Sequence, residues 1–162
     1  KSPNPDLTDY FGVGVAISAD TAVVSAKNED SSATGVNGDS TDDTVPDSGA
    51  AFVFTRSGVT WSQQAYLKAS NTEINDWFGQ SVGIDGDTIV VGAPGEDSNG
   101  SSQADNSVTS AGAAYVFTRS GVTWSQQQYL KAANTTFGDS QGDGFGVAVA
   151  ISGDSVLVSA PG

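Results

Sequence analysis

The stretch FGQSVGIDGDTIVVGAPG, residues 78–95, places two short apolar runs on either side of an Asp-Gly-Asp turn. The same phrase recurs as FGVGVAISADTAVVSA at residues 11–26 and as FGVAVAISGDSVLVSAPG at residues 145–162. Its first phenylalanine stands at positions 11, 78 and 145, a constant spacing of 67 residues. A fixed period indicates stacked supersecondary units. The phrase is therefore interpreted as scaffold, and a phosphate-binding loop is disfavoured because neither a helix nor the required lysine follows it.

A second phrase repeats between the copies of the first. It reads GAAFVFTRSGVTWSQQAYLKA at residues 49–69 and GAAYVFTRSGVTWSQQQYLKA at residues 112–132. Its tryptophans, Trp61 and Trp124, lie 63 residues apart, so the connecting loops change length while the phrases do not. This behaviour is typical of a repeat protein in which loops vary on a constant scaffold.

Apolar residues within each unit alternate with a period of two, which predicts strands rather than helices. Phe145, Val147, Val149 and Ile151 are expected to share one strand face. Tight turns such as Ser152-Gly153-Asp154 then connect successive strands as hairpins. Four short antiparallel strands in each unit predict an all-β fold made of β-propeller blades, with a sandwich or a solenoid as the alternatives.

The units are expected at residues 1–67, 68–130 and 131–162, which amounts to about two and a half blades. A closed propeller needs roughly four to eight blades. Repeat units are stable only when neighbouring units cover their apolar faces. We therefore expect this chain, residues 1–162, to be a partial propeller, completed by the rest of a larger parent protein or by copies of itself.

The composition excludes several classes of partner. The formal net charge is −13, from 19 acidic and 6 basic residues, which disfavours nucleic acid and anionic membrane surfaces. No stretch resembles a membrane-spanning segment or a signal peptide. The absence of cysteine rules out disulfide bonds and thiol chemistry. Abundant serine, threonine, asparagine and glycine with little lysine is consistent with a secreted protein of a bacterial surface.

The residues at the borders of the first phrase carry a family resemblance. Phe78-Gly79 followed by Gly92-Ala93-Pro94 resembles the FG-GAP repeat, the blade unit of the integrin α-subunit propeller and of many secreted bacterial proteins. The other copies contribute Phe145-Gly146 with Ala160-Pro161, and Phe11-Gly12 without the later proline. The resemblance implies a propeller, seven-bladed when complete, whose loops bind ligands and which has no active site.

Calcium is the cofactor that the resemblance suggests, because integrin-type blades carry an Asp-x-Asp-x-Asp-Gly loop between their first two strands. Here that connection is reduced to Ser18-Ala19-Asp20, Asp85-Gly86-Asp87 and Ser152-Gly153-Asp154. Such turns supply too few carboxylates for the six to eight oxygen ligands that Ca²⁺ prefers. The usual calcium site of the family is therefore not expected in these turns.

Acidic residues gather instead in the loop at residues 28–49 and in its counterpart at residues 95–112. Oxygen-rich pairs recur at both margins of the two loops, a pattern that suits a hard cation such as Ca²⁺. The alternative is that aspartate and asparagine form turns and solubilise an exposed loop. The candidate ligands are Glu29, Asp30, Asp42, Asp43, Glu96, Asp97, Asp105 and Asn106.

Catalysis is not expected. The chain has no histidine and no cysteine, the commonest general base and thiol nucleophile. Lys68 and Lys131 share one repeat position, and Arg56 and Arg119 share another, which favours structural roles for these basic residues. Lys27 is the basic residue out of register, because it replaces a proline.

The sequence thus predicts a non-enzymatic extracellular or cell-surface binding and adhesion module, stabilised by calcium if its loops bind the ion. Its ligand is expected to be a protein or a glycan on a surface. Trp77 is the candidate ligand-binding residue, because it stands where Tyr10 and Gly144 stand in the other copies. Trp61 and Trp124 are expected to pack between blades. The alternatives are a carbohydrate-binding propeller and a structural array that assembles from copies of itself.

Overall fold

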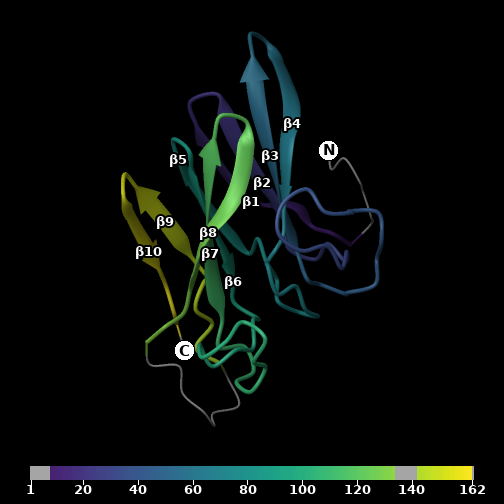
Figure 1. Cartoon of the computed structure of the whole chain (residues 1–162), viewed down its shortest axis with the longest axis vertical. Helices are drawn as coiled ribbons and strands as arrows, with labels where there is room; N and C mark the ends of the chain where they lie inside the picture. Colours follow the sequence, from purple (N-terminus) through teal and green to yellow (C-terminus); the bar gives the residue numbers. More distant parts are fainter. Residues whose placement is uncertain (1–7, 134–141, 162) are drawn as a thin grey trace.

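The computed structural model describes residues 8–133 and 142–161, and these residues contain ten β-strands (Figure 1). The strands are β1 (Phe11–Ser18), β2 (Thr21–Ala26), β3 (Ala50–Ser57), β4 (Thr60–Leu67), β5 (Ser81–Asp85), β6 (Thr88–Ala93), β7 (Ala113–Ser120), β8 (Thr123–Leu130), β9 (Val149–Ser152) and β10 (Ser155–Val158). Within the described residues, no helical segment has the length and hydropathy that a membrane span requires.

The strands form separate sheets that follow the repeat. Strands β1–β4 make one four-stranded antiparallel sheet, strands β5–β8 make a second, and β9 pairs with β10. Within each sheet, every strand pairs with the strand that follows it in the chain. Between units, β1 contacts β5 and β5 contacts β9, and β2 and β6 also contact the first strand of the next unit. This arrangement confirms the prediction of all-β propeller blades, and the described units do not close into a ring (Figure 1).

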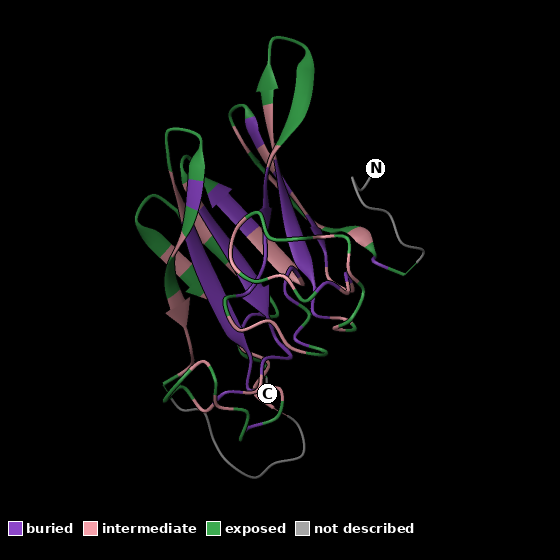
Figure 2. Cartoon of the chain, turned by 45° about the vertical axis from the view of Figure 1, so that its right-hand side comes forward, coloured by how far each residue is buried: buried purple, intermediate pink, exposed green. Residues whose placement is uncertain are grey.

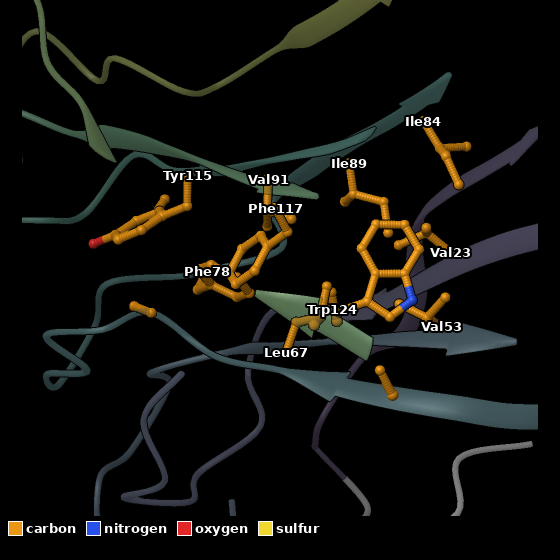
Figure 3. Close-up of a cluster of buried hydrophobic side chains, with 14 of the residues drawn as sticks. Val23, Val53, Leu67, Phe78, Ile84, Ile89, Val91, Tyr115, Phe117 and Trp124 are labelled. Atoms are coloured by element: carbon orange, nitrogen blue, oxygen red, sulfur yellow. The ribbon is translucent and has the colours of Figure 1, made fainter. Parts of the chain in front are cut away.

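The main core lies between the two four-stranded sheets. Val23, Val53 and Leu67 of the first sheet face Phe117 and Trp124 of the second, and all five side chains are buried (Figure 3). Phe78 and Tyr115 extend this cluster, and their ring centroids lie 5.3 Å apart in an edge-on arrangement. Face-to-face burial of aromatic and branched side chains is the main stabilising contribution in such a stack.

The third unit packs on the opposite face of the second sheet. Val90, Ala114 and Val116 are buried there against the half-buried side chains of β9 and β10, which include Ile151 and Val156. The outward faces at the two ends of the stack are more exposed. Leu157 of β10 is 73% exposed and Ile17 of β1 is 65% exposed. Figure 2 shows the buried colour in both four-stranded sheets, mainly in the parts of the strands away from the hairpin tips.

The Phe-Gly motif stands at or just before the first strand of each unit, β1, β5 or β9. Gly79 and Gly146 have φ angles of +95° and +102°, a backbone region that disfavours side chains. The carbonyl oxygen of Ala113 would lie 2.3 Å from a Cβ at Gly146, so the missing side chain also permits close approach between units. The sequence predicted that Phe145, Val147, Val149 and Ile151 share one strand face, and this prediction is wrong for Val147. Phe145, Val149 and Ile151 face the second sheet, whereas Val147, which follows Gly146, lines a pocket among the loops.

Trp124 and Trp61 occupy the same repeat position in different surroundings. Trp124 is 3% exposed and its indole Nε1 donates a hydrogen bond to Gln64 of the first sheet at 2.8 Å, which confirms its predicted packing between blades. Trp61 is 42% exposed, so the packing between blades that the sequence predicted for it is not observed in the described residues. Trp124→Ala is expected to lower the free energy of unfolding by about 3–5 kcal/mol. Trp61→Ala should cost about 1 kcal/mol or less. Urea denaturation of both variants tests this, and equal losses would contradict it.

Candidate functional site

The long loops gather at one end of the stack, opposite the hairpin turns (Figure 1). They comprise the β2–β3 loop, the β6–β7 loop, the segment that leads into β5 and residues 142–148, which lead into β9. Because these segments change length and composition between units while the strands do not, this end is where the molecule can present a specific surface.

A pocket of about 410 Å³ opens among these loops. All three units contribute to it: Lys27 comes from the first, Trp77 and Gln80 lead into the second, and Val147 belongs to the third. The remaining lining residues are Pro94, Ser110, Gly142, Gly144 and Pro161. Two prolines of the repeat motif therefore form part of its wall, and the lysine that replaces the proline of the first copy supplies its cation.

Trp77 and Lys27 are the chemically distinctive side chains of the pocket. Lys27 Nζ lies 5.8 Å from the centroid of the Trp77 ring and donates a hydrogen bond to Gln80 Oε1 at 3.1 Å. Trp77 is 36% exposed, and its backbone N–H is anchored on the carbonyl oxygen of Asp47 at 3.1 Å. The pocket thus presents an indole, an ammonium group and an amide to a ligand.

The sequence identified Trp77 as a ligand-binding candidate and Lys27 only as an anomaly of the repeat. The structure brings the two residues together, although they lie in different units. Lys27 replaces the proline that the other two copies share, and Trp77 stands at a position that differs in all three copies. This shared variability is the signal by which the pair could have been found. The role of Trp77 in binding stays a prediction.

Glu29, a predicted metal ligand, lies in a buried polar cluster at the start of the β2–β3 loop. Its Oε2 accepts a hydrogen bond from Lys68 Nζ at 2.9 Å, and its Oε1 accepts one from the Tyr66 hydroxyl at 2.6 Å. Lys68 Nζ also donates to Ser48 Oγ at 2.7 Å. Burial lowers the pKa of Lys68, and burial together with the nearby Glu29 raises the pKa of Tyr66. The cluster fastens both ends of the loop to the end of β4.

Glu96 occupies the equivalent position in the second unit. Lys131 Nζ donates to its Oε2 at 2.7 Å, and Asn71 Nδ2 donates to its Oε1 at 2.9 Å. Asn71 lies in the segment that connects β4 to β5, and its Oδ1 accepts a hydrogen bond from Tyr115. The repeated lysines are therefore structural, as the sequence predicted, because each one neutralises a buried glutamate.

Most of the other predicted metal ligands already form hydrogen bonds with neighbouring residues. Asp30 and Asp97 accept backbone N–H groups of Asp47 and Ser110, at 2.7 and 2.6 Å. Asp42 accepts hydrogen bonds from Ser32 and Thr44, which lower its pKa to about 2, and Asp105 accepts from Ser107. The side-chain nitrogen of Asn106 donates to Glu73. Asp43, which matches Asn106 in the repeat, is exposed in the β2–β3 loop.

These contacts do not fit a calcium centre. In the parts of the chain that the structure describes, no three acidic side chains are grouped so that they could hold a metal ion. Glu29 and Glu96 each face a lysine instead, and the aspartates serve as acceptors for turns. Calcium binding by these loops therefore stays a prediction of the sequence that the geometry does not support.

Asp76 is a buried carboxyl two residues before Phe78. Its Oδ2 accepts the backbone N–H of Glu73 at 2.9 Å. Burial raises the pKa of Asp76 to about 8, and the neighbouring Glu96, Glu73 and Asp97 act in the same direction. At pH values between 3.8 and about 8, the folded protein therefore keeps a proton on Asp76 that the unfolded chain, with a pKa near 3.8, has released.

This shift predicts a pH dependence of stability. The free energy of unfolding should fall as the pH rises from 3.8 toward about 8, because the folded state binds the proton more tightly. Asp76→Asn keeps an acceptor for the N–H of Glu73 and cannot ionise. Its advantage over the unmodified chain is expected to grow between about pH 5 and about pH 9. A stability difference that is constant across this range, measured by urea denaturation, would contradict the assignment.

The comparisons with known proteins agree with this architecture. A family model described as the FG-GAP repeat matches residues 5–54, 61–117 and 124–162. No curated protein matches the chain significantly. The second and third matched segments begin in the last strand of the preceding sheet, so the repeat of the family is offset by one strand from the sheets. With three repeats that together cover most of its length, the chain belongs to the FG-GAP repeat family.

Proposed function

We propose that the chain is a non-enzymatic binding module of an extracellular or cell-surface protein, and that it holds its ligand in the pocket over Trp77. The observation that carries the proposal is the pairing of Trp77 with Lys27 in a pocket of about 410 Å³ on the loop end. FG-GAP repeats are found in propeller-like binding modules, which is consistent with this assignment. The loops around the pocket would recognise a glycan or a protein that is displayed on a surface.

The chemistry of the pocket favours a flat ligand with an acidic group, such as a sugar acid in a glycan. An indole face suits the apolar side of a sugar ring. Lys27 has no ion-pair partner among the described residues, so its ammonium group is available to a carboxylate. Gln80 adds an amide that can hydrogen-bond to hydroxyl groups.

A glycan screen that contains matched neutral and acidic sugars tests the proposal. Trp77→Ala is expected to weaken binding at least about tenfold, and Lys27→Met should remove the preference for acidic over neutral ligands. Trp61→Ala is the matched control, because Trp61 is exposed but lies away from the pocket. Binding that Trp77→Ala leaves unchanged would overturn the assignment of the site.

Calcium is tested separately by the melting temperature in EDTA and in millimolar Ca²⁺. If the loops bind the ion, mass action requires a higher melting temperature with calcium than with EDTA. The contacts of Glu29 and Glu96 with lysine lead us to expect no shift. A clear rise that Asp42→Asn abolishes would restore the calcium prediction.

A further inference from the structure

Glu96 bridges a lysine and an asparagine in the buried polar cluster at the start of the β6–β7 loop. Its Oε2 accepts a hydrogen bond from Lys131 Nζ at 2.7 Å, and its Oε1 accepts one from Asn71 Nδ2 at 2.9 Å. Asn71 lies in the segment that leads into β5, and Lys131 directly follows β8. One carboxylate thus holds an amine and a carboxamide that precede and follow the second sheet in the chain.

The oxygen of the same carboxamide faces a separate donor. The Tyr115 hydroxyl donates to Asn71 Oδ1 at 2.6 Å, and burial raises the pKa of Tyr115, so the phenol stays protonated. Asn71 Nδ2 also donates to the backbone carbonyl oxygen of Gln103 at 2.9 Å, which fixes the plane of the amide. A donor therefore polarises the carbonyl group of Asn71, while its nitrogen faces a carboxylate.

Water has little access to this cluster. Glu96 and Tyr115 are buried, the side chain of Lys131 is 7% exposed, and Asn71 is half-buried. Burial disfavours the charged forms of an amine and a carboxyl group, which favours transfer of the proton between them. Exclusion of water also disfavours hydrolysis of the carboxamide, the reaction that competes with attack by an amine.

The first unit shows the same ion pair with a different third partner. Glu29 Oε2 accepts a hydrogen bond from Lys68, but Glu29 Oε1 accepts the Tyr66 hydroxyl. Among the hydrogen bonds of the described residues, no amide side chain donates to Glu29. The repeat equivalent of Asn71 is Asn4, which lies outside the described residues. The geometry therefore singles out the second unit, and Lys68 serves as its control.

We propose that Lys131 and Asn71 join through an amide bond between their side chains, formed by the folded chain itself with Glu96 as the general base and acid. Glu96 takes a proton from Lys131 Nζ, and the neutral amine attacks Cγ of Asn71. The Tyr115 hydroxyl stabilises the negative charge that develops on Oδ1. Because the folded cluster already holds these groups together, the reaction needs no further loss of translational freedom.

The remaining steps release ammonia. Glu96 gives its proton to Nδ2 of Asn71, the bond between Cγ and Nδ2 breaks, and Glu96 accepts the second proton that Lys131 Nζ loses. Overall, a lysine ammonium group and a carboxamide give a secondary amide and an ammonium ion, without an oxidant or another co-reactant. The bond encloses the whole second sheet, and it limits the freedom of the unfolded chain as a disulfide does, in a protein that has no cysteine.

Trypsin digestion of the full chain, followed by mass spectrometry, tests the proposal. Trypsin cuts after lysine and arginine, but it does not cut after an acylated Lys131. We expect residues 69–119 to stay joined to residues 120–162, with a mass lower than the sum of the two peptides by one ammonia. Fragmentation should place the bond between Asn71 and Lys131. Separate peptides 69–119 and 120–131, after purification and again after prolonged incubation of the folded protein, would overturn the proposal.

Variants of the cluster test the assigned roles. Lys131→Arg keeps a positive charge beside Glu96 but supplies no nucleophile, and it should abolish the joined peptide, as should Glu96→Gln. Tyr115→Phe should slow formation of the bond at least about tenfold. Lys68→Arg is the matched control and should leave the joined peptide in place. A loss of ammonia from residues 69–119 that persists in Lys131→Arg, or a bond that forms as fast in Glu96→Gln, would contradict the mechanism.

Discussion

Lys68→Met is expected to lower the free energy of unfolding by about 3–5 kcal/mol, because it leaves the Glu29 carboxylate buried without its cation. The residual hydrogen bonds of Glu29 come from Tyr66 and from the N–H and hydroxyl of Ser31, and none of these donors carries a charge. Glu29 is 4% exposed, so water cannot replace the ammonium group without opening the loop. Equilibrium denaturation in urea measures the loss.

A double substitution separates the charge from the shape of the side chains. Lys68→Met combined with Glu29→Gln removes both charges, and we expect it to be less destabilising than Lys68→Met alone. Lys27→Met is the control for loss of a lysine, and should change stability by about 0.5 kcal/mol or less because Lys27 is only half-buried. A double variant as unstable as the sum of its two single variants would show that the pair does not act as a unit.

Gly79→Ala is expected to lower the free energy of unfolding by about 3 kcal/mol, and Gly12→Ala by about 1–2 kcal/mol. Both glycines follow the phenylalanine of the motif with similar φ angles, +95° and +99°, so both substitutions strain the backbone equally. Only at Gly79 would the new Cβ lie 2.7 Å from the carbonyl oxygen of Ala50 and 2.8 Å from the Ser25 Cβ. At Gly12 no atom lies within 4 Å.

The difference between these two variants isolates the close approach of neighbouring units, because the conformational cost cancels. It is measured by denaturation of the two variants under identical conditions. Equal destabilisation would mean that the glycine of the motif serves only the turn, and that the units are not packed as tightly as the contacts of Gly79 indicate.

Local pattern was sufficient to predict the strands and their hairpins. Alternation of apolar residues and the turns at Asp20, Asp87 and Asp154 act over a few residues, and antiparallel pairing of consecutive strands follows from them. The exception, Val147, arises because Gly146 adopts a positive φ angle that reverses the expected side of the strand. Periodicity carries no information about such a residue.

Contacts between distant residues were not predictable in the same way. Glu29 and Lys68 each recur in the repeat, but their ion pair requires the β2–β3 loop to fold back under the end of β4. The different exposure of Trp61 and Trp124 depends on which neighbouring unit is present, and their local sequences are the same. Repetition at matching positions was the available signal for the ion pair, since both members recur together as Glu96 and Lys131.

The central claim is that successive units are separate sheets packed face to face, with their first strands side by side. Nuclear Overhauser effects between protons, measured by NMR, test this claim most directly. The account predicts contacts from the Trp124 indole N–H to the Gln64 side chain, and from the Val82 methyl groups to Gly14. Backbone contacts between β4 and β5, as in one continuous sheet, would contradict it.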